Sequence, residues 1–112
     1  MSEFESQAHA VFAEGGPAVD VKMRRFHGDG VAALRMILPK GATTVKHYHY
    51  YSHLSVAAAG VALLRRSDTK EAIRVVAGEV VEIPPKVEHT IQALTDVVWI
   101  CFHATATENA HD

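Results

Sequence analysis

Residues 41–60 read GATTVKHYHYYSHLSVAAAG and place three of the chain's eight histidines within seven residues. Side chains alternate across a strand with a period of two, so His47, His49 and His53 would share one face of an extended segment. A helix would rotate residues two positions apart by about 200° and separate them. The Val, Thr and Tyr content also favours a strand. This stretch therefore predicts an extended segment with three imidazoles on one face.

Three imidazoles on one face have two interpretations. Neutral imidazole is a good ligand for Fe, Zn, Cu and Ni, so the first is a transition-metal site. The second is a set of exposed histidines on an edge strand, which is the commoner explanation for an isolated His-x-His. Because a third histidine stands in register, the two interpretations are about equally supported by this stretch alone.

Length and composition describe an ordinary globular domain. The 112 residues suffice for one domain, nearly half of them are hydrophobic, and the formal net charge is −2. That balance argues against a nucleic-acid surface or a polybasic membrane contact. The single Cys101 excludes an internal disulfide and Cys-rich zinc motifs. An acidic start and a longest apolar run of Val56–Leu64 predict no membrane segment, so we expect a cytoplasmic protein.

The remaining chain predicts an all-β domain of short strands separated by Gly, Pro and Asp turns. An Asp-Gly turn at 27–30 predicts a hairpin between a strand beginning at Val19 and a strand over Val31–Leu38. Residues 1–18 are expected to be a lead-in, 19–108 the barrel domain, and 109–112 a tail.

A second informative stretch, residues 78–93, reads GEVVEIPPKVEHTIQA. A strand that meets Pro84 and Pro85 must leave its ladder and turn, so a new strand is expected near Val87. His89 then lies at the start of a strand, directly after a rigid corner. Alone it would be an ordinary strand histidine, but beside the first stretch it becomes a candidate metal ligand.

The two stretches resemble the motifs of the cupin superfamily, Gly-x5-His-x-His-x3-4-Glu-x6-Gly and Gly-x5-Pro-x-Gly-x2-His-x3-Asn. Together they cover residues 41–93, about half of the chain. Three positions differ from the family pattern: His53 replaces Glu, Lys86 replaces Gly, and Ala93 replaces Asn. The resemblance implies a single-domain cupin, a jelly-roll-type β-barrel. Lys86 puts the local turn in doubt, since a residue other than glycine is strained at positive φ.

The resemblance also implies one divalent transition metal per chain, whether Fe, Mn, Ni, Co, Cu or Zn, held by His47, His49, His53 and His89. Four neutral imidazoles leave the charge of the ion uncompensated, which favours an anionic ligand. An octahedral ion would keep two positions open and permit a metal-dependent dioxygenase or other oxidoreductase acting on a small molecule. Tetrahedral zinc would be structural. A non-catalytic binding module and a dimer with a purely structural metal remain alternatives.

Further residues are candidates for the surroundings of the metal. Tyr51 shares the parity of the histidines. In the last predicted strand Trp99 and His103 lie on one face and Phe102 on the other, and either face could line the pocket. Arg65, Arg66 and Arg74 could meet an anionic substrate, although arginines beside turns are usually solvated. Strands that are apolar on both faces, such as Ala57–Leu64, predict a homodimer, as is common among cupins.

Overall fold

The computed structural model describes residues 11–13, 22–44 and 52–106 of the chain. Within them, all regular elements except a short helical turn after the last strand are β-strands, arranged in two sheets. Sheet A has the order β1 (Val11–Ala13), β4 (Ala42–Thr44), β9 (His89–Ala93), β6 (Val61–Arg66) and β7 (Ile73–Val76). Sheet B has the order β2 (Lys22–His27), β3 (Val31–Leu38), β10 (Val97–Ala104), β5 (His53–Ala59) and β8 (Val80–Ile83). The predicted all-β, jelly-roll-type fold is confirmed.

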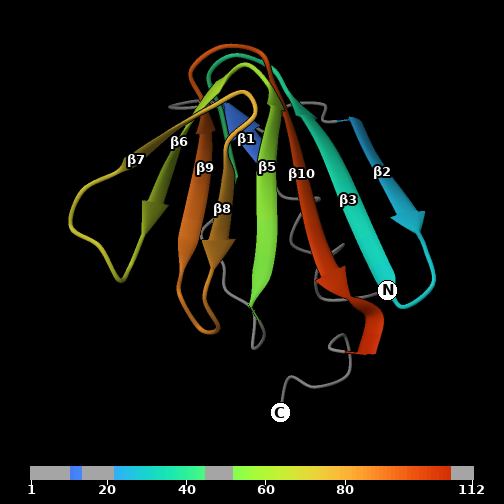
Figure 1. Ribbon diagram of the computed structural model, residues 1–112. Helices are drawn as coiled ribbons and strands as arrows, with labels where there is room; N and C mark the ends of the chain where they lie inside the picture. Colours follow the sequence, from blue (N-terminus) through green and yellow to red (C-terminus); the bar gives the residue numbers. More distant parts are fainter. Residues whose placement is uncertain (1–10, 14–21, 45–51, 107–112) are drawn as a thin grey trace.

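The two sheets face each other, and the chain passes repeatedly from one to the other (Figure 1). β4, β6, β7 and β9 belong to sheet A, whereas β5, β8 and β10 belong to sheet B. Each paired set of strands is antiparallel. β5 and β9 begin, and β6, β8 and β10 end, at the lower edge of the molecule in Figure 1. The topology therefore brings residues from distant parts of the sequence to one end of the barrel.

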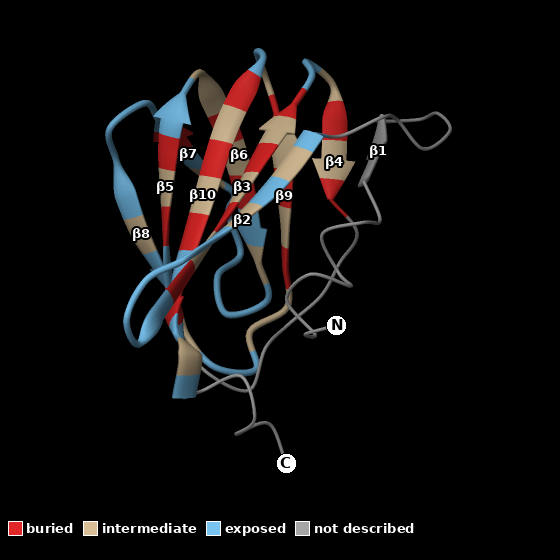
Figure 2. Cartoon of the chain, turned by 90° about the vertical axis from the view of Figure 1, so that its right-hand side faces the viewer, coloured by how far each residue is buried: buried red, intermediate tan, exposed pale blue. Residues whose placement is uncertain are grey.

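Alternating burial along the strands builds the core between the sheets. On β3 and β10 every second residue is buried, which gives the red and tan bands in Figure 2. Trp99 is fully buried and pairs in register with Met36 on β3 and Ala57 on β5. A small alanine opposite the indole leaves room for the ring, so large and small side chains interlock.

Two turns show how backbone conformation joins these strands. The hairpin between β2 and β3 is confirmed: Gly30 has φ 75° and the N–H of Gly28 donates to the carbonyl of Val31 at 2.8 Å. After the two prolines Lys86 takes φ 61°, among the described residues the one side-chain-bearing residue with positive φ. The turn that a cupin makes with glycine is therefore made here with lysine, and His89 begins β9 three residues later, as predicted.

Two expectations about the strands need correction. Residues 41–60 do not form one extended strand, because β4 lies in sheet A and β5 lies in sheet B, so the chain crosses between sheets there. Residues 45–51 of this crossing, with His47, His49 and Tyr51, lie outside the described part. In addition, Val11–Ala13, inside the expected lead-in, pairs with β4 at the edge of sheet A.

Nothing in the described ranges resembles a transmembrane helix: no helix there has the length and apolar character that crossing a bilayer requires.

Candidate metal centre

One end of the barrel collects polar side chains that point inward, and we call it the mouth. It is formed by His53 at the start of β5, Arg66 at the end of β6, His89 at the start of β9 and His103 near the end of β10. The three histidines are 4%, 2% and 5% exposed, in chain order. Each continues the inward parity of its strand, since Ser55, Leu64, Ile91 and Cys101 are also buried.

His53 and His89 approach each other across the two sheets. Their ring centroids are 5.7 Å apart and the rings are tilted by 49°. β5 delivers His53 from sheet B, and the corner at Pro84–Lys86 delivers His89 from sheet A. Two imidazoles predicted as ligands from residues 36 apart in the sequence are therefore neighbours in space.

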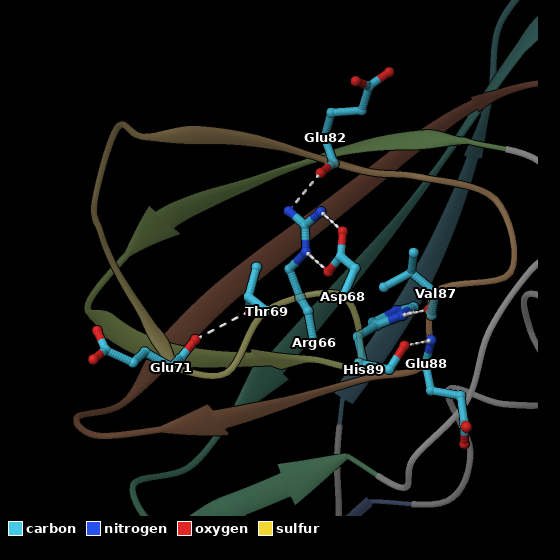
Figure 3. Close-up of polar contacts among 9 residues, drawn as sticks. Arg66, Asp68, Thr69, Glu71, Glu82, Val87, Glu88 and His89 are labelled. Atoms are coloured by element: carbon cyan, nitrogen blue, oxygen red, sulfur yellow. Dashed lines mark hydrogen bonds and ion pairs between the residues drawn. The ribbon is translucent and has the colours of Figure 1, made fainter.

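The backbone holds the His89 ring in one orientation. Nδ1 of His89 lies 3.0 Å from the carbonyl oxygen of Val87 (Figure 3). Since a carbonyl can only accept a hydrogen bond, Nδ1 carries a proton and donates it, and in the neutral ring Nε2 then carries the lone pair. A hydrogen bond from one ring nitrogen to a backbone carbonyl is the arrangement that orients metal-binding histidines. The chemistry of this residue fits a metal ligand that binds through Nε2.

The residues predicted to surround the metal separate into two faces of β10. Trp99 and His103 point into the barrel, Trp99 deep in the core and His103 at the mouth. Phe102 lies on the outer face of sheet B and is 39% exposed. Extending the register of the Leu54–Phe102 pair by one residue places His103 opposite His53. The structure thus brings His53, His89 and His103 to one end of the barrel, and takes Phe102 away from the interior.

Burial shifts the pKa values of the two polar residues that β10 points into the barrel, His103 and Cys101. Burial, with smaller contributions from the positive charge of Arg25 and from His27, holds the pKa of His103 below 6.5. Burial also raises the pKa of the Cys101 thiol to about 11, against smaller lowering contributions from the Ser55 hydroxyl and the Trp99 indole. Ser55, which sequence reasoning did not identify, donates its hydroxyl hydrogen to Sγ of Cys101 at 3.3 Å. Cys101 is therefore a buried thiol that stays neutral at physiological pH.

Two cavities open beside the mouth. One, of about 300 Å³, is lined by Arg65, Arg66, Ser67, Glu88, His89 and Thr90. The other, of about 260 Å³, is lined by residues of sheet B that include His53, Glu82, Phe102 and His103. Of the predicted ligands, His89 lines the first cavity and His53 lines the second. Volumes of this order match small-molecule sites at the lower end of their range.

Within the described ranges, no three His, Cys, Asp or Glu side chains are arranged to hold a metal ion. Two of the four predicted ligands, His47 and His49, fall between residues 45 and 51. The described half of the predicted set, His53 and His89, has the burial, proximity and donor chemistry that a metal site needs.

Similarity to solved structures is extensive although sequence identity is low. A cupin family protein with a double-stranded β-helix fold from Methanocaldococcus jannaschii aligns with TM-score 0.66 and 21% identity, over 78% of this chain and 82% of that one. A cupin-like protein from Thermotoga maritima aligns with TM-score 0.65 and 24% identity, over 80% and 70%. KdgF from Halomonas aligns with TM-score 0.64 and 19% identity, over 77% and 87%.

Comparisons of sequence find less. No family model matches the chain, and no curated protein matches it significantly. Structural likeness at these identities establishes the fold and leaves the activity open. The two histidine motifs, the two facing sheets and the solved structures agree: this chain has the cupin fold, a double-stranded β-helix.

Proposed function

We propose that the mouth binds one divalent transition metal per chain through His47, His49, His53 and His89, and that the metal serves an oxygenase-type reaction on a small organic molecule. The observation that carries the proposal is the buried pair His53 and His89, 5.7 Å apart, with the His89 tautomer set by Val87. A bound metal would supply Lewis acidity and, if redox-active, electron transfer to dioxygen.

The protein's own side chains prepare this end of the barrel for such chemistry. Beneath the mouth Ile91, Ile83 and Trp99 are almost completely buried, so water is excluded from the interior side of the imidazoles. The Val87 carbonyl holds the His89 ring, and the cavity of about 300 Å³ beside it admits a small ligand from solvent. The proposed ligands include no carboxylate, so an anionic substrate gains from the uncompensated charge.

Metal content tests the binding part of the proposal. After reconstitution with Fe, Mn, Co, Ni, Cu or Zn and removal of excess ion, elemental mass spectrometry should find about one metal per wild-type chain. His53→Ala and His89→Ala should each retain about a tenth or less of it, since removing one ligand weakens binding strongly. His27→Ala, an exposed histidine at the end of β2, is the matched control and should bind as the wild type does. Equal metal content in all four proteins would contradict the site.

Oxygen consumption and thermal melting test the catalytic part. The metal-loaded wild type should consume dioxygen with at least one small phenolic or carbonyl compound, and His89→Ala should not. A tightly bound metal with no turnover would favour a binding module. If chelation also abolished folding, the metal would be structural and the oxygenase assignment would be wrong.

A homodimer is the second part of the proposal, and the outer face of sheet B supports it. This face exposes a large apolar side chain on each of its five strands: Phe26 (39%), Val31 (44%), Leu54 (49%), Val80 (62%) and Phe102 (39%). One edge of the face is basic, with Lys22 and Arg24 on β2, and the opposite edge carries Glu82 on β8. A two-fold axis parallel to the strands would cover the apolar centre and place β2 of one copy over β8 of the other.

Light scattering at micromolar concentration checks this assembly. The wild type should have the mass of a dimer, and Phe102→Glu should have the mass of a monomer. Val76→Glu is the matched control, because Val76 is equally exposed at 39% but lies on β7 in sheet A. A monomeric wild type, or a dimer that Val76→Glu alone disrupts, would overturn the proposed interface.

A further inference from the structure

Arg66 occupies a position at the mouth where its strand otherwise points apolar side chains inward. Ala62 and Leu64 on β6 are fully buried, and Arg66 follows with the same parity. In register it stands directly opposite His89 on β9. Its Nη1 donates to the carbonyl oxygen of Glu82 on β8 at 3.2 Å, so the guanidinium reaches from sheet A to sheet B (Figure 3). A permanent positive charge therefore lies beside a proposed metal ligand.

Asp68 holds this guanidinium in a defined orientation. Nε donates to Oδ1 at 2.8 Å and Nη2 donates to Oδ2 at 2.6 Å, which is a bidentate pair. The side chains of Arg66 and Asp68 are 15% and 37% exposed, so the arginine is the more enclosed partner. Together with the bond to Glu82, three of the five N–H groups are used within the described part of the chain. Among the described residues, one N–H on each terminal nitrogen has no partner and is left to bind a ligand.

The cavity beside Arg66 carries a net positive lining. Arg65 and Arg66 contribute two guanidinium groups, and Glu88 contributes one carboxylate. Two hydrogen bonds hold the rim of the cavity together. The N–H of Ser67 donates to the carbonyl oxygen of Glu88 at 2.9 Å, and the N–H of Glu88 donates to the hydroxyl oxygen of Ser67 at 3.1 Å. Arg65 Nη1 donates to Oε1 of Gln92 at 2.8 Å, which directs its charge toward β9. Arg66 is therefore a cavity-lining residue that is held in one orientation and, among the described residues, still has N–H groups to donate.

We propose that Arg66 recognises the carboxylate of a small carboxylic acid that enters this cavity and reaches the mouth beside His89. The two remaining N–H groups match the two oxygens of a carboxylate, and the rigid fork of arginine suits a planar anion. A phosphate dianion fits less well, because Glu88 and Asp68 would repel its larger charge. This inference names the substrate class for the proposed metal site and rests on that proposal for its chemistry, whereas its binding test does not require the metal.

Titration calorimetry with pyruvate tests the inference on the full chain, both metal-loaded and after chelation. Pyruvate should bind at least tenfold more tightly than pyruvamide, its neutral analogue. Arg66→Gln should weaken pyruvate binding at least tenfold, and Arg66→Lys should weaken it less, because lysine keeps the charge without the fork. Arg74→Gln is the matched control, an exposed arginine on β7 outside the cavity, and should change the affinity less than twofold.

A second variant keeps the test decisive if Arg66→Gln does not fold. Glu88→Gln removes the carboxylate from the cavity lining and should tighten pyruvate binding severalfold. Unchanged affinity in Glu88→Gln, equal affinity in a folded Arg66→Gln, or tighter binding of inorganic phosphate than of pyruvate would overturn the inference. Metal content is measured on the same samples. If the wild type takes up no metal, the proposed function fails, while the dependence of pyruvate binding on Arg66 still decides this inference.

Discussion

The two ends of the barrel are built from different side chains on the same strands. Inward residues change from apolar to polar in one direction on four strands: Val97, Trp99, Cys101 and His103 on β10; Ala57, Ser55 and His53 on β5; Ala93, Ile91 and His89 on β9; Ala62, Leu64 and Arg66 on β6. The apolar end stabilises the fold because it removes hydrocarbon from water, whereas enclosing imidazole and guanidinium groups costs them hydration. The apolar end therefore holds most of the hydrophobic core, and the proposed binding site depends on the polar side chains of the opposite end.

Turns at the apolar end, which we call the closed end, are tied to one another by hydrogen bonds. The N–H of Gly41 donates to the carbonyl of Ala93 at 2.8 Å, and that of Lys40 donates to Oδ1 of Asp96 at 2.9 Å. The N–H of Val61 donates to Oγ1 of Thr95 at 3.0 Å. These bonds close the barrel where its core is apolar, whereas the two cavities open beside the mouth.

Of all the changes considered, removing the largest core side chain should destabilise the fold most. Trp99→Ala should lower the free energy of unfolding by about 3–5 kcal/mol, because it opens a cavity in a fully buried site. Val76→Ala, on β7 and 39% exposed, should cost about 1 kcal/mol or less. Urea unfolding measures both. Equal losses would contradict a tightly packed core around Trp99.

Replacing Gly60 should have the next largest effect on stability, because a side chain at this position would meet the backbone of the closed end. A Cβ would lie 2.0 Å from the carbonyl oxygen of Asp96 and 2.7 Å from Oγ1 of Thr95, at φ +82°. Gly60→Ala should therefore cost about 2–4 kcal/mol. Gly30→Ala has a similar φ of +75° with open space around the Cβ, and should cost about 1–2 kcal/mol from φ alone.

The difference between these two variants isolates the steric contact from the backbone conformation. Thermal or urea unfolding of both is sufficient. If Gly30→Ala proved as destabilising as Gly60→Ala, close packing of the closed end around Gly60 would be refuted.

At the mouth we expect a smaller effect than at the closed end. The free energy of unfolding should depend on pH there. The folded-state pKa of His103 lies below its unfolded value of 6.5, so the unfolded chain binds a proton first as the pH falls. In chelated protein the free energy of unfolding should decrease from about pH 6.5 downward and level off, for this group, below its folded pKa. His103→Gln should lose less stability over that interval. A steeper loss in the variant would contradict the sign of the shift.

Much of this architecture follows from local sequence. Val31–Leu38 was predicted with its observed bounds, because it alternates inside and outside between clear turn residues. The start of β9 at His89 follows from two prolines that force a corner. Pairing β1 with β4 was missed, since three residues of an edge strand carry no periodic signal and owe their conformation to a partner 31 positions away.

The site was harder to predict than the fold. Parity alone placed Trp99 and His103 on one face of β10 and Phe102 on the other, but which face is inward depends on the opposite sheet. The significance of Arg66 also depends on contacts that no sequence pattern shows, namely its pairing with His89 across strands and its bond to the Glu82 carbonyl. The alternation Ala62, Leu64, Arg66 was the available signal, and the adjacent turn obscured it.

X-ray absorption at the edge of the bound metal tests the central claim most directly. The account predicts a first shell of nitrogen and oxygen ligands with the outer-shell scattering of about four imidazoles, and loss of one imidazole contribution in any residual metal site of His89→Ala. A shell without imidazole scattering, or a spectrum unchanged in His89→Ala, would contradict a metal held at the mouth of this barrel.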